Sequence, residues 1–202
     1  DVPFPVGEEN EDFEEIENVN ETSKERKEEK SKIEIKYINE AQSIAEKSFI
    51  DLLNIVKAGV SEKDLAIELE YLMRKNGANG ISFDTIVVSG KNSSLPHGVP
   101  TDKFVTAGDF ITFDFGAVVN GYHSDMTRTV AVGYATDKMK EIYQVVLDSH
   151  NNAAKITKAG VLCSDVDIAA RDYICSKGYG DFFGHSTGHG VGLEIHEKPT
   201  IY

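Results

Sequence analysis

The chain has 202 residues and a formal net charge of −13, with 34 acidic against 21 basic residues. This length allows one domain with a sizeable core. The sequence contains no basic patch that would indicate a nucleic-acid ligand. Its apolar runs are all shorter than a membrane span, which needs about 18 residues. Most of the acidic excess lies at the start, since residues 1–30 carry a net charge of −8. We therefore expect residues 1–32 to be an acidic linker or tail and residues 33–202 to form the folded domain.

Two helices are predicted next, over residues 38–56 and 61–77, with a serine cap at the start of the second and a glycine at its end. The stretch KAGVSEKDLAIELEYLMRKNGA, residues 57–78, recurs 101 residues later as KAGVLCSDVDIAARDYICSKGY, residues 158–179. A further helix is predicted just before this second copy, over residues 137–157. A repeat at one fixed offset indicates a duplicated helix–helix–strand unit.

Strands are predicted after each helix pair, which makes the fold class α+β. In the first copy they cover residues 82–90, 109–119 and 121–132, and in the second copy a glycine-rich strand covers residues 181–196. The second copy then stops at Tyr202, where the first copy still has strands to come. We therefore expect the second half of the duplicated fold to be incomplete in this chain.

The stretch DFGAVVNGYHSDMTRT places two aspartates in a predicted hairpin. The Asn-Gly pair at 120–121 favours a two-residue turn, which sets Asp114 opposite Thr127 and Asp125 opposite Gly116. Both carboxylates then point to one face, about 7–8 Å apart or less, and Gly116 leaves space beside Asp125. Two close carboxylates among apolar residues share either a proton or a cation, so a divalent metal fits. The alternative is a surface hairpin whose aspartates face water.

Four of the six histidines occur in glycine-rich contexts, one in SSLPHGVP and three in GHSTGHGVGLEIHE. The glycines make a helix improbable there, which excludes the helical zinc pair of an H-E-x-x-H enzyme. Imidazoles join carboxylates on divalent metals or carry protons near neutral pH, whereas the alternative for each is a core or solvent-facing histidine. The candidate functional histidines are His97, His185, His189 and His196, and the other two, His123 and His150, are interpreted as non-functional.

These motifs, SFDTIVVSGKNSSLPHGVP, GDFITFDFGAVVNGYHSDMTRTVAVG and GHSTGHGVGLEIHE, resemble the Xaa-Pro aminopeptidase and prolidase branch of the pita-bread metallopeptidases. This group is related to methionine aminopeptidase and creatinase, and the resemblance runs from about Ile33 to Tyr202. It implies a pita-bread fold, with duplicated helix–helix–strand halves around a curved, mostly antiparallel sheet. Residues 33–202 would then be a partial catalytic domain.

The resemblance also implies a cofactor and a reaction. Relatives carry two divalent ions, Mn²⁺ or Co²⁺ in the first place and Zn²⁺ or Fe²⁺ as alternatives, and a hydroxide between the ions attacks the peptide bond ahead of proline. The implied metal ligands are Asp114, Asp125, which bridges both ions, and His189. The implied pocket residues, which hold the peptide and assist proton movement, are His97, His185 and His196.

The sequence departs from the family pattern in one respect. Two further glutamate ligands, one of them the general base, are expected after the histidine motif and are not among these 202 residues. We therefore expect this chain to be inactive alone, although its parent would hydrolyse peptides with proline at the second position. The alternatives are a non-catalytic pita-bread module that binds peptides or proteins, and a methionine aminopeptidase.

Compartment and assembly are also predicted. Cys163 and Cys175 fall in one predicted helix and are interpreted as free thiols, the usage of a reducing compartment. A cytoplasmic location follows, with no membrane or nucleic-acid partner. The resemblance adds a homodimer to these expectations.

Overall fold

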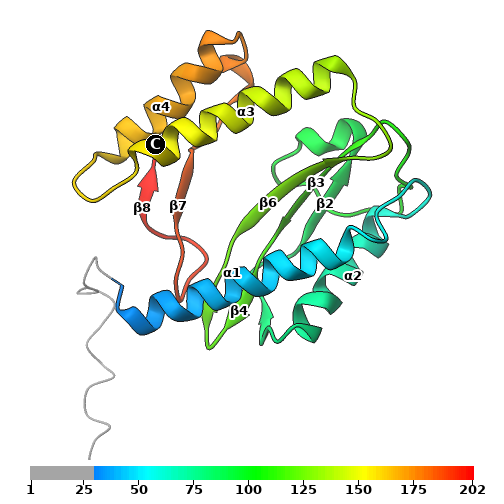
Figure 1. Cartoon of the computed structure of the whole chain (residues 1–202), viewed down its shortest axis with the longest axis horizontal. Helices are drawn as coiled ribbons and strands as arrows, with labels where there is room; N and C mark the ends of the chain where they lie inside the picture. Colours follow the sequence, from blue (N-terminus) through cyan, green and yellow to red (C-terminus); the bar gives the residue numbers. More distant parts are fainter. Residues whose placement is uncertain (1–29) are drawn as a thin grey trace, which may run out of the picture. The chain divides into compact units, whose positions relative to one another are not determined.

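The computed structural model describes residues 30–202 (Figure 1). The acidic segment predicted over residues 1–32 lies outside this range except for its last three residues. The first helix, predicted over residues 38–56, instead covers Lys32–Leu52. In chain order, the elements of the described residues are α1 (Lys32–Leu52), α2 (Glu62–Lys75), β1 (Gly80–Ile81), β2 (Ile86–Ser89), η1 (Gly90–Ser94), β3 (Phe110–Phe115), β4 (Ala117–Val119), β5 (Tyr122–His123), β6 (Met126–Ala131), α3 (Asp137–Ile156), α4 (Cys163–Ser176), η2 (Gly180–Phe182), β7 (Gly188–Gly190) and β8 (Glu197–Ile201).

Serine caps fix the starts of the first two helices. The Ser31 side chain accepts a hydrogen bond from the backbone of Glu34, whose carboxylate in turn accepts one from the Ser31 backbone, so α1 begins with a capping box. Ser61 accepts a hydrogen bond from the backbone N–H of Asp64 at 3.0 Å. The predicted cap at Ser61 is therefore confirmed, and it satisfies one of the orphan donors at the start of α2.

The internal repeat is visible in the backbone. The bounds of α2 and α4 differ by 101 residues at both ends, which is the offset of the sequence repeat. Gly59 and Gly160, which precede these helices, have φ angles of 90° and 87°, and Gly77 and Gly178, which follow them, have 113° and 81°. Positive φ favours glycine, so the matched glycines keep the same turns in both copies and confirm the duplicated unit.

The strands are shorter than the sequence predicts and form three antiparallel sheets, with orders β1-β4-β5, β2-β3-β6 and β7-β8. The strand predicted over 109–119 is divided into β3 and β4 at Gly116, and only Ile86–Ser89 of the stretch 82–90 is extended. The strand predicted over 181–196 is wrong for most of its length, because only Gly188–Gly190 is extended. That short strand instead pairs with β8, which sequence periodicity did not predict.

The main core lies between the first helix pair and one face of β3. Along β3 the side chains alternate between fully buried and half-buried, and the buried set packs against α1 and α2. Phe49 of α1 stacks on Phe115 at 5.5 Å between ring centroids and meets Phe113 edge-on at 5.4 Å. Asp114 lies between these two phenylalanines in sequence, so the alternation of the strand turns it to the opposite face.

The second helix pair packs separately. Helices α3 and α4 lie side by side, and α4 contacts β8 (Figure 1). Their small core contains Ala153, Val166 and Ala170 with Ile201 against it. Both cysteines are free, as predicted, and none of the helices within residues 30–202 is long and apolar enough to span a membrane.

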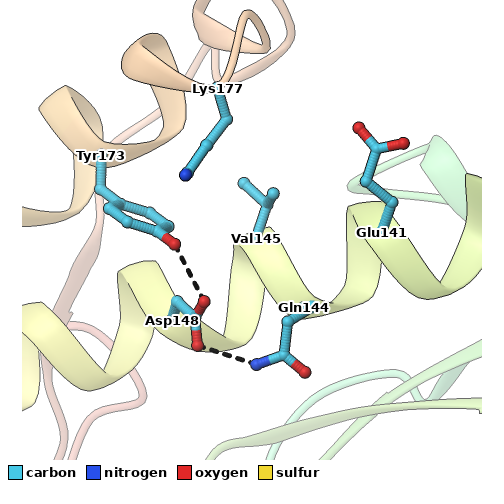
Figure 2. Close-up of a pocket in the computed structure, with 6 residues that line it drawn as sticks. All are labelled: Glu141, Gln144, Val145, Asp148, Tyr173 and Lys177. Carbon is cyan, nitrogen blue, oxygen red and sulfur yellow. Dashed lines mark hydrogen bonds between the residues drawn. The ribbon is translucent and has the colours of Figure 1, made fainter.

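A polar groove of about 320 Å³ lies along α3 and α4 (Figure 2). Asp148 closes it by accepting hydrogen bonds from the Tyr173 hydroxyl at 2.9 Å and from Gln144 at 2.8 Å. These bonds lower the pKa of Asp148 and raise that of Tyr173. Because Asp148, Tyr173 and Gln144 already bind one another, the groove is a weaker candidate for a functional site than the carboxylate hairpin.

Candidate metal centre

The predicted hairpin forms with the predicted register. Asn120 and Gly121 have φ angles of 50° and 82°, the signature of a turn with positive φ at both central residues. Asp114 pairs with Thr127, and the Thr127 hydroxyl donates a hydrogen bond of 2.6 Å to the Asp114 carboxylate. The sequence reasoning predicted the pairing but missed this hydroxyl, although the register alone places it opposite the carboxylate.

The space beside Asp125 is filled rather than open, which corrects the interpretation of Gly116. A Cβ atom on Gly116 would lie 1.9 Å from the carbonyl oxygen of Ser124. The neighbouring backbone is tightly bonded, because Ser124 donates its N–H to the Ala117 carbonyl at 2.9 Å and its hydroxyl accepts from the Ala117 N–H at 3.0 Å. Glycine is therefore required so that two backbones can meet immediately before Asp125.

The two aspartates repel each other in a partly desolvated site. Burial raises the pKa of Asp114 above its ordinary value, and the Thr127 hydroxyl and the charges of His189 and His97 only partly oppose this. Burial also raises the pKa of Asp125, and the negative charge of Asp114 raises it further. Like charges in low dielectric disfavour ionisation, so a cation between these carboxylates would relieve both effects.

His189 reaches Asp125 from the second half of the chain. It lies in β7, and its Nε2 atom is 3.3 Å from the Asp125 carboxylate, with both side chains about one-quarter exposed. Its Nδ1 atom is 3.0 Å from the carbonyl oxygen of Gly190, which assigns the proton to Nδ1. Nε2 then presents a lone pair to a carboxylate oxygen, an arrangement that requires a proton or a cation between them.

Two of the other predicted histidines lie near this group. His196 packs its ring on His189, with 4.3 Å between centroids, and its charge lowers the pKa of Asp125, although burial, the larger effect, keeps that pKa raised. His97 is exposed on its loop, yet it is close enough to Asp114 to influence that carboxylate. The structure therefore brings His189 and His196 to Asp125, whereas His97 acts on Asp114 through its charge.

His185 is positioned differently. Its ring packs on Phe183 at 5.5 Å, and its Nδ1 atom lies 2.9 Å from the carbonyl oxygen of Ser186. Its segment is held by Arg171, which donates hydrogen bonds to the carbonyl oxygens of Phe183 at 2.8 Å and of His185 at 2.9 Å. The ring of His185 thus contacts its own loop, whereas its carbonyl oxygen binds Arg171 of α4.

An ion pair between the half-buried Arg171 and the buried Asp167, which the sequence reasoning missed, supports this loop. Asp167 accepts two hydrogen bonds from Arg171, at 2.7 and 3.0 Å, and one from the Thr187 hydroxyl at 2.6 Å. The bonds from Arg171 are the main reason that the pKa of Asp167 lies below its ordinary value. The spacing of four residues on α4 is the sequence signal for this pair, whereas its contacts to the loop are visible only in the structure.

His123, which the sequence reasoning set aside, is also notable. Its Nδ1 atom is buried and has no hydrogen-bond partner within the described part of the chain. Its backbone N–H donates to the carbonyl oxygen of Gly192 at 2.8 Å, which links β5 to the loop between β7 and β8. His123 is therefore a contact between the halves that no local pattern indicates.

The donors present suit a divalent ion but do not enclose one. Carboxylate oxygens and a neutral imidazole are ligands for Mn²⁺, Fe²⁺, Co²⁺ and Zn²⁺. Within residues 30–202, however, no three acidic, histidine or cysteine side chains are arranged closely enough to hold a metal by themselves. The close pair is Asp125 with His189, and Asp114 contributes charge from the adjacent strand.

The sequence model of metallopeptidase family M24 matches residues 36–202. The chain is 45% identical over 172 residues to the Xaa-Pro dipeptidase of Pyrococcus horikoshii, which covers 85% of this chain and 49% of that protein. It is 52% identical, with the same coverage, to an uncharacterized peptidase of Bacillus subtilis, YqhT.

Solved structures show the same similarity. The X-Pro aminopeptidase of Thermotoga maritima superposes with a TM-score of 0.83 at 49% identity, covering 85% of this chain and 49% of that one. The prolidase of Pyrococcus furiosus also gives a TM-score of 0.83, at 46% identity, with 85% and 51% covered. The chain thus spans about half the length of the relatives it matches.

Proposed function

Because the chain belongs to metallopeptidase family M24, we propose that it carries part of the active site of a peptidase that cleaves ahead of proline at the second position of a peptide. The proposal is supported by the names of its relatives, an Xaa-Pro dipeptidase and an X-Pro aminopeptidase. The observation that carries it is the convergence of Asp114, Asp125 and His189. Asp114 lies in β3 and Asp125 between β5 and β6, both in the first repeated half, whereas His189 lies in β7 of the second half.

In this proposal Asp114, Asp125 and His189 would be the ligands of two divalent ions, Mn²⁺ or Co²⁺ in preference to Zn²⁺ or Fe²⁺. Such ions, when bound, supply water activation and polarisation of the scissile carbonyl. The repulsion between the carboxylates and the Nε2 lone pair aimed at Asp125 support this assignment. His189 is kept in the ligating tautomer by the carbonyl oxygen of Gly190.

The remaining histidines are assigned to the substrate. His196, stacked beside His189, would move a proton at a ring nitrogen, and His97, exposed near Asp114, would contact the peptide. His185 would contact the peptide from the loop that Arg171 anchors. A homodimer, which the family resemblance implies, and a cytoplasmic location, which the two free thiols suggest, are further predictions.

A second candidate function is a non-catalytic module that binds peptides. The observation that favours it is the lack of a closed three-ligand group within residues 30–202. The two candidates agree that the 202-residue chain by itself hydrolyses Ala-Pro very slowly or not at all. They differ over metal binding, which the peptidase requires and the module does not.

The test is therefore metal binding first and hydrolysis second. Titration calorimetry with Mn²⁺ is expected to show binding to the wild-type chain and its loss in Asp125→Asn, while Asp102→Asn, a control whose side chain is 92% exposed, binds as the wild type does. Hydrolysis of Ala-Pro, Ala-Pro-Ala and Met-Ala-Ser is then measured with Mn²⁺ or Co²⁺, with EDTA as the control. EDTA-sensitive cleavage ahead of proline, in this chain or in one extended past Tyr202, supports the peptidase. Equal Mn²⁺ binding by both variants would refute the metal assignment.

A further inference from the structure

Glu62 is a fully buried carboxylate at the first position of α2. One of its oxygens accepts hydrogen bonds from the backbone N–H and the hydroxyl of Ser89, both at 2.7 Å. The other accepts from the backbone N–H of Thr101 at 3.2 Å and from its hydroxyl at 2.7 Å. A buried charge is stable only when its lone pairs are satisfied, and these four donors satisfy them.

The carboxylate is held in its charged form. Burial raises the pKa of Glu62, but the hydrogen bonds from Ser89 and Thr101 outweigh this and keep that pKa below its ordinary value. Lys103 adds a second layer, since its ammonium group donates to the Ser89 hydroxyl and, at 3.1 Å, to Asp109. Hydrogen bonds to a charged acceptor are about twice as strong as neutral ones, so this is a rigid anchor.

The two partners of Glu62 are the two ends of one loop. Ser89 is the last residue of β2, and Thr101 follows the loop 90–100 that contains His97. The backbone hydrogen bonds within the loop join residues three apart. The Leu95 N–H donates to the Asn92 carbonyl, and the Gly98 N–H donates to the Leu95 carbonyl. These bonds do not connect the loop to the rest of the molecule, so its position is set by its two ends and by its contact with β3.

Because the Glu62 carboxylate binds both ends of the loop, its main effect is to fix the distance between those ends rather than to stabilise the core. Apolar residues of similar volume would stabilise the core as well as a buried charged network does. They would not fix the separation of two backbone segments. The loop is also held from the side, because its turn η1 packs on β3, the strand that carries Asp114, and the Thr112 hydroxyl donates to the Ser93 carbonyl at 3.2 Å.

We propose that Glu62 is a positioning residue that fixes both ends of the loop 90–100 and thereby holds His97 beside Asp114. The role of His97 in this inference rests on the proposed function. The anchoring of the loop does not, because it follows from the hydrogen bonds of the Glu62 carboxylate, which add to the backbone bond from the Lys63 N–H to the Thr101 carbonyl.

The first test is amide hydrogen exchange of the 202-residue chain without metal, followed by NMR. Glu62→Gln keeps the side-chain volume but replaces one acceptor oxygen by a donor group. The matched control is Ser61→Ala, which removes the neighbouring helix cap at Asp64 and leaves the Glu62 contacts in place. Exchange at Leu95 and Gly98 is expected to be about tenfold faster in Glu62→Gln than in the control.

Equal exchange at Leu95 and Gly98 in both variants would overturn the proposal. Where Glu62→Gln does not fold, Thr101→Val provides the same comparison, because it removes only one hydroxyl donor to the carboxylate.

The second test locates His97 relative to the metal site, with Mn²⁺ as a paramagnetic probe. In the wild type, Mn²⁺ is expected to broaden the ring protons of His97 and His196. In Glu62→Gln the broadening of His97 is expected to fall by about half or more, while His196, held by His189, keeps its broadening. Unchanged broadening of His97 would overturn the positioning role. A loss confined to His97 distinguishes this role from general structural damage, which would also reduce the broadening of His196. Absence of broadening in the wild type would count against the proposed metal site, and the exchange comparison would still decide whether Glu62 anchors the loop.

Discussion

Replacing Gly116 by alanine is the most direct test of the close backbone contact beneath the candidate site. The new Cβ atom would lie 1.9 Å from the Ser124 carbonyl oxygen and 2.8 Å from the Ser82 hydroxyl. Since real Cβ contacts essentially never fall below 3.0 Å, the carbonyl would have to retreat by about 1.1 Å. Ser124 cannot yield easily, because both its N–H and its hydroxyl bind Ala117.

Overpacking of this kind costs about 3 kcal/mol. For a domain of this size that corresponds to a fall in Tm of about 6–12 °C, measurable by circular dichroism. Moving Ser124 also displaces Asp125, so the rise in Tm that saturating Mn²⁺ gives the wild type is expected to shrink in Gly116→Ala.

Gly80→Ala is the matched control for this prediction. Gly80 lies in β1, in the sheet that β4 joins, it has no positive φ, and a Cβ there would meet nothing within 4 Å. Its Tm is expected to equal that of the wild type or to rise slightly. A Gly116→Ala chain as stable as the Gly80→Ala control would refute the backbone contact and the explanation for the break between β3 and β4.

Two further predictions concern charge. Asp114→Asn is expected to raise the Tm of the metal-free chain, because it removes the charge repulsion with Asp125 while its amide oxygen still accepts a hydrogen bond from Thr127. It is also expected to abolish stabilisation by Mn²⁺. A lower Tm without metal would contradict this reasoning. Asp167→Asn is expected to destabilise the chain by about 2 kcal/mol at pH 7, measured by urea unfolding, because it weakens the pair with Arg171. Since the folded pKa of Asp167 is lowered, its contribution is present above the unfolded pKa of about 3.9 and is lost as the pH falls through the folded pKa. The difference between wild type and variant should therefore be constant from pH 5 to 7 and shrink below about pH 4; a difference that grows on acidification would contradict the sign.

The sequence predicted the local features of the site well. The Asn-Gly turn fixes the register of the hairpin because few residues tolerate positive φ at both central positions, and Asp114 accordingly pairs with Thr127. The repeat predicted the positions of α2 and α4, and the serine at 61 predicted the start of α2. Each of these depends on residues close together in the chain.

The strands in the structure are shorter than the predicted ones, because other segments approach the backbone closely at glycines. The sequence predicts one strand over residues 181–196, yet only Gly188–Gly190 pairs. Gly190 instead admits the Lys198 carbonyl at 2.6 Å from a would-be Cβ, and Gly192 admits the Glu197 carboxylate. Such close approaches depend on the partner segment, so periodicity in the glycine-rich stretch carries no information about them.

By itself, the sequence determined the two helices of the internal repeat, the cap at Ser61 and the hairpin with its two aspartates, because these follow from backbone preferences and short-range patterns. Only the tertiary structure decided that His189 reaches Asp125, that Ser124 fills the space at Gly116, and that Glu62 binds both Ser89 and Thr101. These contacts join residues that are far apart in the chain or depend on how close two backbones come. Their geometry is set by how the packed elements meet, and no local propensity encodes that.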